Sequence, residues 1–484
     1  MHRQATDRQR RKRPILEWIL PLFLVAAVGS ARLEAAELPP IPAKNDAQAK
    51  WKAGVASIVI TPERSMWMAG YAARNKPSEG KIHDLRAKAL ALEDAQGTRL
   101  VIVTTDLIGI PRRLRDQLQE EVGQRYGLAP QSLLLTASHT HCGPELRATK
   151  ASLYGLPPER VRQCEEYLEG LRQKLLGLVG QAMDDLAPAR LAYTHARAGF
   201  AMNRRLKTDR GFENRPAPDG PVDHDVPVLR VDSEDGKLRA VLFGYACHNT
   251  TLGFYKFCGD YAGFAQQYLE EAHPGTTALF VAGCGGDQNP QPRRTLALAE
   301  QHGRALANGV EAALISQPRP VRGPLQVALD EVALEFAQPP SRGQLEREAK
   351  SDNEFERRRA ELLLKELDEN GKLRSTYPYL IHVAQFSNDL TLVALAGEVV
   401  VDYSLRLKAE LAGPPVWVAA YANDVFGYVP SRRVLLEGGY EARDSIRYYS
   451  SLPAPFAPSL EERIVDKVHE LVNKVRGAKS GGRG

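Results

Sequence analysis

The segment that decides the fold lies at residues 132–144 and reads SLLLTASHTHCGP. Its first part, Ser132–Thr136, is a short apolar run of strand length. Its second part, Ser138–Pro144, is a polar turn that carries two histidines. An apolar run that ends abruptly in turn residues is typical of a strand buried in a sheet.

Three further apolar runs end in the same way. Each is followed within two residues by a polar side chain or loop: Ala240–Ala246 by His248, Leu390–Ala396 by Glu398, and Thr277–Ala282 by Gly283–Asn289. The carboxyl ends of parallel strands meet at one edge of a sheet, where α/β proteins bind their ligands. We therefore expect these side chains to converge with the two histidines of the first segment.

Strand-like runs alternate with amphipathic helical patterns along the chain. The strands are predicted at Leu100–Thr104, Ser132–Thr136, Ala240–Tyr245, Thr277–Ala282 and Leu390–Ala396. The helices are predicted at Arg113–Tyr126, Val161–Met183, Tyr261–Glu271, Leu296–Ile315 and Val399–Leu411. This alternation predicts an α/β fold with β-sheets flanked by helices and the site at the carboxyl ends of strands.

Two helical segments follow in the last third of the chain. Gln344–Glu369 is highly charged, with leucines on one side, and predicts a solvated surface helix rather than a binding surface. Ser459 and Glu462 form a capping-box pattern at the start of a last helix. The apolar residues of that helix make one stripe, which favours core packing: Leu460, Ile464, Val465, Val468, Leu471, Val472 and Val475.

The composition is that of a soluble globular protein. Of 484 residues, 43% are hydrophobic and 25% are charged, which excludes wholesale disorder, a collagen-like fibre and a polytopic membrane protein. Outside residues 1–36, 57 lysines and arginines face 56 aspartates and glutamates, a net charge of +1. A nearly neutral body lacks the electrostatic footprint of a nucleic-acid-binding protein, so we expect no nucleic-acid partner.

The first 36 residues have the pattern of an export signal. The basic run Arg8–Arg13 precedes the apolar stretch Ile15–Val28, and small residues suitable for cleavage follow near Ala31 or Ala36. The apolar stretch is short for a membrane span. We predict an exported protein, periplasmic or extracellular, with an uncleaved membrane anchor as the alternative.

The rest of the chain is predicted to contain one large domain. A Pro- and Ala-rich linker is expected at 37–49, a single domain at 50–476 and a disordered tail at 477–484. The five cysteines are an odd number and form no C-x-x-C pair, so neither a zinc ribbon nor a thioredoxin-like site is expected. A disulfide that involves Cys247 or Cys258 is left open.

The histidine pair carries the chemistry. His139 and His141 are two residues apart, so on an extended segment both side chains project to the same face. One could ligate a metal while its neighbour transfers protons. Two imidazoles and a carboxylate from separate strands, with an open position for water, suit catalytic zinc. The alternative is that these histidines are hydrogen-bonded polar residues of loops.

These residues resemble a known family. Ser138–Pro144 is similar to the Ser-His-Thr-His-Ser-Gly-Pro signature of the neutral (non-lysosomal) ceramidases. The other matching motifs occur in the family's order across residues 50–450: Met68–Tyr71, Asn203-Arg204, Ala246–His248, Gly397-Glu398, Tyr428 and Tyr440. The resemblance implies that residues 50–476 form a catalytic domain in which zinc-activated water hydrolyses the amide of an N-acylated sphingoid base.

The resemblance also implies a role for each matching residue. One zinc ion per chain would be held by His139, His248, Glu398 and Tyr428. His141 would transfer the proton. Arg204 and Tyr440 would polarise the substrate carbonyl and stabilise the oxyanion, although Arg205 stands beside Arg204. The expected partner is a small molecule or lipid with an N-acyl group, with transient contact to a membrane surface.

The sequence departs from the family pattern in three places. Cys142 replaces the usual serine after the second histidine, and Asn289 stands where many members have serine. The chain also ends soon after Tyr440, so we expect no C-terminal β-sandwich domain of the kind that full-length ceramidases carry. The elements around the site on which the family's access to lipid depends are not traceable in this sequence, so the resemblance implies hydrolysis of an N-acyl bond without implying ceramide itself.

Three alternatives stay open. The first is a hydrolase that acts on a different amide or an ester. The second is a cysteine hydrolase that uses Cys142 or Cys247, although His141 and Cys142 point to opposite faces of an extended chain. The third is a lipid- or carbohydrate-binding protein without catalysis. The third is disfavoured because a degenerate site is expected to lose at least one site residue, and this sequence keeps all five of the set His139, His141, His248, Glu398 and Tyr428.

Overall fold

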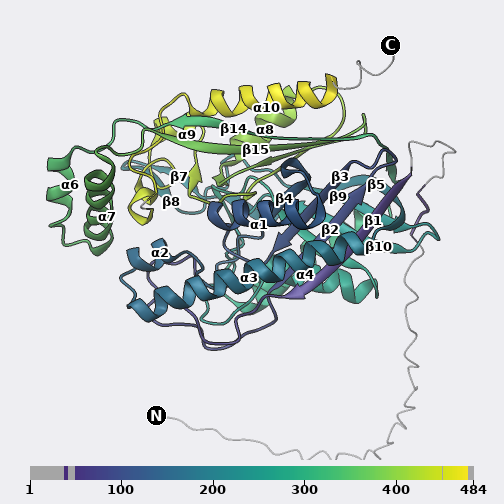
Figure 1. Ribbon diagram of the computed structural model, residues 1–484, viewed down its shortest axis with the longest axis horizontal. Helices are drawn as coiled ribbons and strands as arrows, with labels where there is room; N and C mark the ends of the chain where they lie inside the picture. The colour runs from purple at the N-terminus through teal and green to yellow at the C-terminus, as the bar shows by residue number, and fades with distance from the viewer. Residues whose placement is uncertain (1–37, 42–49, 450, 478–484) are drawn as a thin grey trace, which may run out of the picture. The chain divides into compact units, whose positions relative to one another are not determined.

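The computed structural model describes residues 38–41, 50–449 and 451–477. The predicted export signal lies outside these residues, as do most of the predicted linker and all but the first residue of the predicted tail. The described residues form two large β-sheets and three short strand pairs, with helices against the outer faces of the large sheets. The predicted fold class, α/β with sheets flanked by helices, is therefore confirmed (Figure 1).

The larger sheet is mixed. Its order is β11 (Thr277–Ala282), β10 (Leu238–Tyr245), β9 (Asp225–Ser233), β5 (Ala187–Arg197), β1 (Trp51–Val59), β2 (Arg86–Glu93), β3 (Arg99–Thr105) and β4 (Leu133–Ala137), with β13 (Arg319–Val321) pairing to β5. The pairs β3/β4 and β10/β11 are parallel, and the pairs between them are antiparallel. The two parallel pairs therefore lie at opposite ends of the sheet.

The second sheet has the order β14 (Leu325–Glu335), β15 (Thr376–Phe386), β16 (Leu390–Leu395) and β18 (Val416–Ala419). Three short pairs complete the β-structure: β6 (Ala201–Asn203) with β12 (Gln288–Pro290), β7 (Arg205–Thr208) with β8 (Gly211–Asn214), and β17 (Glu398–Val399) with β19 (Tyr428–Val429). The pair β17/β19 is parallel and sets Glu398 directly opposite Tyr428.

The two sheets bury one apolar layer between them. Leu92, Leu134 and Leu242 come from the larger sheet, while Phe386 and Trp417 come from the smaller one. Burial of apolar side chains in such a layer contributes favourably to folding. The sheets therefore act as one rigid support for the loops at their ends.

Helices cover the outer faces. Against the larger sheet pack α3 (Pro158–Asp184), α4 (Asp260–Ala272) and α5 (Leu296–Leu314), with α1 (Arg112–Tyr126) on α3. Against the smaller sheet pack α8 (Val401–Glu410) and α10 (Leu460–Gly477), and α10 runs along β14 and β15 (Figure 1). The remaining helices are α2 (Ala148–Leu153), α6 (Arg342–Glu348), α7 (Glu354–Asn370) and α9 (Arg432–Glu437).

The segment after β18 links the two ends of the larger sheet. Ala420 donates its main-chain N–H to Ala282 at the end of β11, and Gly283 bridges to Ala419. Ala137 at the end of β4 donates to the carbonyl of Tyr421. Because one segment bonds to the first and last strands of the sheet, the loops that follow β4, β10 and β11 are brought together.

The five predicted strands and the five predicted helices between them are confirmed to within three residues at each end. A separate prediction was wrong, because the highly charged segment Gln344–Glu369 is not one helix. It is divided into α6 and α7, and the side chain of Asn353 accepts hydrogen bonds from the N–H groups of Phe355 and Glu356 to begin the second helix. An N-cap of this kind stabilises the start of a separate helix.

The last helix keeps its predicted stripe but not its predicted cap. All seven stripe residues of α10 are buried. The hydroxyl of Ser459 instead donates to Glu335, and Glu462 pairs with Arg406 of α8. After Tyr440 the described residues form a short 3-10 turn at Asp444–Tyr448 and then α10, so they contain no β-sandwich.

No described helix combines the length and the apolar composition that crossing a bilayer requires.

Candidate metal centre

Four side chains from separate strand ends meet in a buried cluster. His139 follows β4, His248 follows β10, and Glu398 begins β17 opposite Tyr428 of β19. His139 has a positive φ of 60°, a conformation that non-glycine residues seldom adopt and that is concentrated at functional sites. The predicted convergence of these residues is therefore present in the structure.

Both of these histidines are oriented by the main chain. Nδ1 of His139 donates to the carbonyl of Ile108 at 2.6 Å, and Nδ1 of His248 donates to the carbonyl of Gly285 at 2.6 Å. A carbonyl partner on Nδ1 fixes the tautomer in which Nε2 carries the lone pair, as in the histidine ligands of metal sites. Burial, followed by the charge of Arg204, lowers the pKa of His248 to about 4, which keeps its imidazole neutral.

The two free nitrogens face one carboxylate oxygen. Oε2 of Glu398 lies 3.2 Å from Nε2 of His139 and 3.3 Å from Nε2 of His248. With the proton on Nδ1, these contacts join acceptors to an acceptor, an arrangement that repels unless a cation lies among the three atoms. Nitrogen and carboxylate ligands in this number fit Zn²⁺. The residues present therefore fit a metal ion.

His141 belongs to the cluster but differs in its contacts. Its Nε2 lies 3.3 Å from Nε2 of His139, and the ligand nitrogens of His139, His141 and His248 all lie within 4.8 Å of one another. Its Nδ1 is buried without a hydrogen-bond partner among the described residues. Burial, followed by the neighbouring His139, holds the pKa of His141 well below its usual value.

Arg204 lies behind Tyr428. Its Nη2 donates to the hydroxyl of Tyr428 at 3.0 Å, its Nη1 to Asn289 at 3.3 Å and its Nε to Glu441 at 2.8 Å. Arg205 points away and pairs with Glu441 through its own Nη1 at 2.6 Å. The structure thus shows which of the two adjacent arginines lies at the site, a choice that the sequence left open. Arg204 lies against Tyr428 and does not line the cavity.

The cluster opens into a cavity of about 210 Å³. Fourteen residues line it: Gly70, Tyr71, Ala72, Ile108, His139, His141, Arg147, Lys150, Tyr154, Glu398, Tyr428, Tyr440, Tyr448 and Tyr449. The predicted site residue Tyr440 is among them, and its ring centroid lies 5.5 Å from that of Tyr428. The side chains of Tyr440 and His141 thus line the same cavity beside the carboxylate.

Tyr449 is a site residue that the sequence analysis did not identify. Its hydroxyl donates to Oε1 of Glu398 at 2.8 Å. This hydrogen bond occupies the carboxylate oxygen that does not face the histidines. Glu398 itself is buried, at 5% exposed. Neither a motif nor a spacing marks this tyrosine in the sequence.

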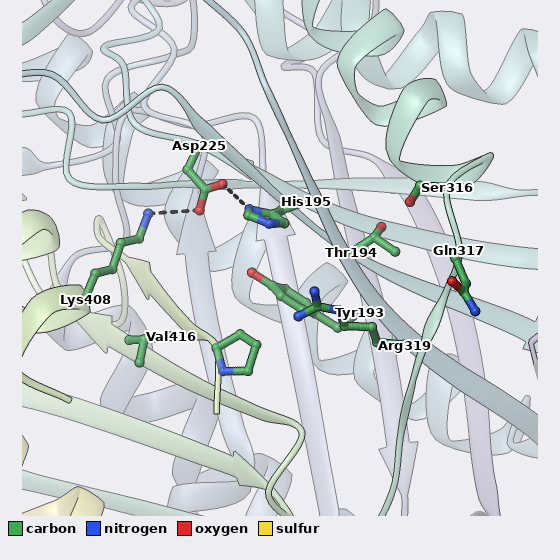
Figure 2. Close-up of a pocket in the computed structure, with 10 residues that line it drawn as sticks. Tyr193, Thr194, His195, Asp225, Ser316, Gln317, Arg319, Lys408 and Val416 are labelled. Carbon is green, nitrogen blue, oxygen red and sulfur yellow. Dashed lines mark hydrogen bonds and ion pairs between the residues drawn. The ribbon is translucent and has the colours of Figure 1, made fainter. Parts of the chain in front are cut away.

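A larger cavity of about 420 Å³ lies elsewhere, between β5, β9 and α8. Figure 2 shows that Asp225 in this cavity bonds to both His195 and Lys408. It contains none of the clustered histidines. The smaller cavity is therefore the candidate site.

The cysteines do not contribute to the candidate site. All five are buried and none forms a disulfide, including Cys247 and Cys258. Burial raises the pKa of the Cys142 thiol to about 12, and Cys142 does not line the cavity. A buried thiol of this kind is a poor nucleophile at neutral pH.

The fold and the cluster together define an α/β protein with a buried site that can hold a metal ion. The chain belongs to the neutral/alkaline non-lysosomal ceramidase family, because the family's N-terminal domain matches residues 51–291, about half of its length.

The relatives support this membership. Neutral ceramidase A of Dictyostelium discoideum is 26% identical over 250 residues, and the neutral ceramidase of Mycobacterium tuberculosis is 24% identical over 268 residues. These matches cover 47% and 53% of this chain but only 34% and 40% of those proteins. The crystal structure of neutral ceramidase from Pseudomonas aeruginosa shares the fold, with a TM-score of 0.70 at 19% identity over 89% of this chain and 75% of that one.

Proposed function

We propose that this protein is an exported, zinc-dependent hydrolase of an N-acyl bond in ceramide or a related N-acyl compound. The observation that carries the proposal is the contact of two main-chain-oriented imidazoles with one buried carboxylate oxygen, at 3.2 and 3.3 Å. Membership of the ceramidase family supports the reaction class. The relatives cover the chain only in part, so the substrate belongs to the proposal.

The residues proposed to hold the metal are His139, His248 and Glu398, with Tyr428 completing the set. The hydroxyl of Tyr428 lies 3.3 Å from Nε2 of His248, on the side of the cluster that Arg204 contacts. One zinc ion per chain would act as a Lewis acid and lower the pKa of water towards neutrality. Arg204, by donating to Tyr428, orients that phenol and favours negative charge on its oxygen.

His141 is proposed to carry the proton. It lines the cavity, and its Nδ1 has no partner among the described residues, whereas Nδ1 of each proposed ligand histidine is held by a carbonyl. An imidazole that is neutral at rest can accept a proton from water and return it to the leaving amine. This difference in Nδ1 partners is why we assign His141 to proton transfer rather than to the metal.

Tyr440 is proposed to stabilise the charge that develops on the carbonyl oxygen. Burial raises the pKa of its hydroxyl, so it remains a hydrogen-bond donor at neutral pH. Arg204 would support the same step only through Tyr428, because its donor nitrogens are engaged with Glu441, Asn289 and Tyr428. We therefore treat Arg204 as a positioning residue.

The test is metal analysis of the purified protein combined with hydrolysis of N-acyl substrates. One zinc per chain and hydrolysis that stops with a chelator and returns with zinc are expected. Zinc without hydrolysis of any amide or ester would favour the lipid- or carbohydrate-binding alternative. Hydrolysis without metal would refute the proposed centre. Sequencing the amino terminus of protein recovered outside the cytoplasm tests the proposed export, and a cytoplasmic chain with an intact first segment would contradict it.

A further inference from the structure

A lysine lines the candidate site and has no assigned role. Lys150, in α2, is 8% exposed and shares the cavity wall with His139, His141 and Glu398. Its ammonium group donates to the main-chain carbonyl of Tyr448 and lies 3.7 Å from the ring centroid of Tyr449. Burying an ammonium is costly unless an anion accompanies it.

No carboxylate among the described residues lies within 4.0 Å of this ammonium group. The neighbouring cation does have such a partner, because Arg147 forms two hydrogen bonds to Glu145 at 2.7 and 2.8 Å. In the larger cavity of Figure 2, Lys408 is likewise paired, with Asp225 at 3.0 Å. Of the two cationic side chains that line this cavity, Arg147 has a carboxylate partner and Lys150 has none among the described residues.

Burial, followed by the charge of Arg147, lowers the pKa of Lys150 to about 7. An anion brought into the cavity would offset this depression by favouring the charged form of Lys150, and would itself gain a buried partner.

The position of Lys150 relative to the metal cluster sets where such an anion would lie. Tyr449 separates the two, since its hydroxyl bonds to Glu398 while its ring faces the ammonium group. The cavity of about 210 Å³ equals the liquid volume of roughly seven water molecules. It can hold an amide and one small charged group, while a long acyl chain would extend outside it.

We propose that the substrate carries a carboxylate close to the scissile N-acyl bond, as an N-acyl amino acid does, and that Lys150 binds this carboxylate. The inference rests on the proposed function and narrows its substrate class to anionic N-acyl compounds, which excludes ceramide, a neutral N-acyl alcohol. A neutral N-acyl alcohol would leave Lys150 buried without a counter-ion.

The experiment compares three substrates with the same acyl chain: N-lauroylglycine, its neutral amide N-lauroylglycinamide, and N-lauroylethanolamine. For the zinc-loaded wild type, kcat/KM for the glycine substrate is expected to exceed that of either neutral substrate by about tenfold or more, because a buried charge left unpaired is strongly disfavoured. Lys150→Met keeps the apolar stem of the side chain. It is expected to abolish this preference, and Lys365→Met, on the exposed side of α7, should retain it.

The outcomes separate the inference from the proposed function. Hydrolysis of all three substrates without a preference for the carboxylate, or a Lys150→Met variant that loses activity equally on all three, would overturn the role of Lys150 while the proposed function stands. If none is hydrolysed, calorimetric binding of N-lauroylglycine and N-lauroylglycinamide decides. Tighter binding of N-lauroylglycine that is lost in Lys150→Met would support anion binding by Lys150 and refute the proposed hydrolysis. Equal binding of the two compounds would refute both the role of Lys150 and the proposed hydrolysis. Lys150→Gln replaces Lys150→Met if that variant does not fold.

Discussion

Replacing Tyr449 with phenylalanine tests whether Glu398 is a metal ligand. The change removes one hydroxyl, which donates to Oε1 of Glu398 at 2.8 Å, and keeps the ring that faces Lys150. The carboxylate is 5% exposed, so water cannot readily replace the lost donor. A hydrogen bond to a buried charged group contributes about 1.5–3 kcal/mol. We therefore expect zinc to bind about 10-fold to 100-fold more weakly, in line with other partners of metal ligands.

The assay is a competition titration of the metal-free protein against a chromophoric zinc chelator. Tyr448→Phe is the matched control, because it removes a hydroxyl from the next residue of the same cavity wall without a contact to Glu398. Its zinc affinity should equal that of the wild type. A Tyr449→Phe protein that is folded and binds zinc within twofold of the wild type would refute the assignment of Glu398 as a ligand held by Tyr449.

Four further changes test other parts of the site. His141→Ala should keep zinc near one per chain and lose activity, and loss of zinc would make His141 a ligand. Tyr440→Phe should lower kcat by roughly 10²–10³ at unchanged zinc content, as expected for the loss of one oxyanion donor, and a silent variant would remove it from the mechanism. Cys142→Ser should keep most of the activity, whereas a large loss with zinc retained would revive a cysteine nucleophile. Gly70→Ala would place a Cβ 2.4 Å from the His141 ring at a φ of 95°, so kcat should fall; Gly97→Ala, at a φ of 82° with open space around it, is the control for backbone strain alone.

The strands that hold the cluster were predictable because each is an apolar run that ends in a polar motif. β4, β10, β11 and β16 all have this pattern, since their side chains are buried on both faces. β1 was not predicted, because exposed and buried residues are mixed along it and its sequence lacks a continuous apolar run. Its place in the sheet comes from pairing with β2 and β5, which are distant in sequence.

The members of the site were predictable where a motif marked them. His139, His141 and Glu398 each follow an apolar strand, which identifies them as strand-end residues. Their convergence depends on the segment after β18, because β4 lies at the opposite end of the larger sheet from β10 and β11. Tyr449 and Lys150 could not be found in this way, because their roles depend on how a turn and a short helix pack over the cavity. The choice between Arg204 and Arg205 likewise required the structure, since the two side chains diverge from neighbouring positions to opposite oxygens of Glu441.

The link between the two ends of the larger sheet has a consequence for the order of folding. The segment Ala419–Asn423 reaches both β4 and β11, and Glu398 and Tyr428 stand on either side of it in sequence. A nascent chain that ends before residue 398 would contain both proposed histidine ligands without the carboxylate or the segment that brings the histidines together. Contacts of such large sequence separation form late and slowly. Tight zinc binding should therefore begin only when nearly the whole chain is available, which makes metal uptake a reporter of completed folding.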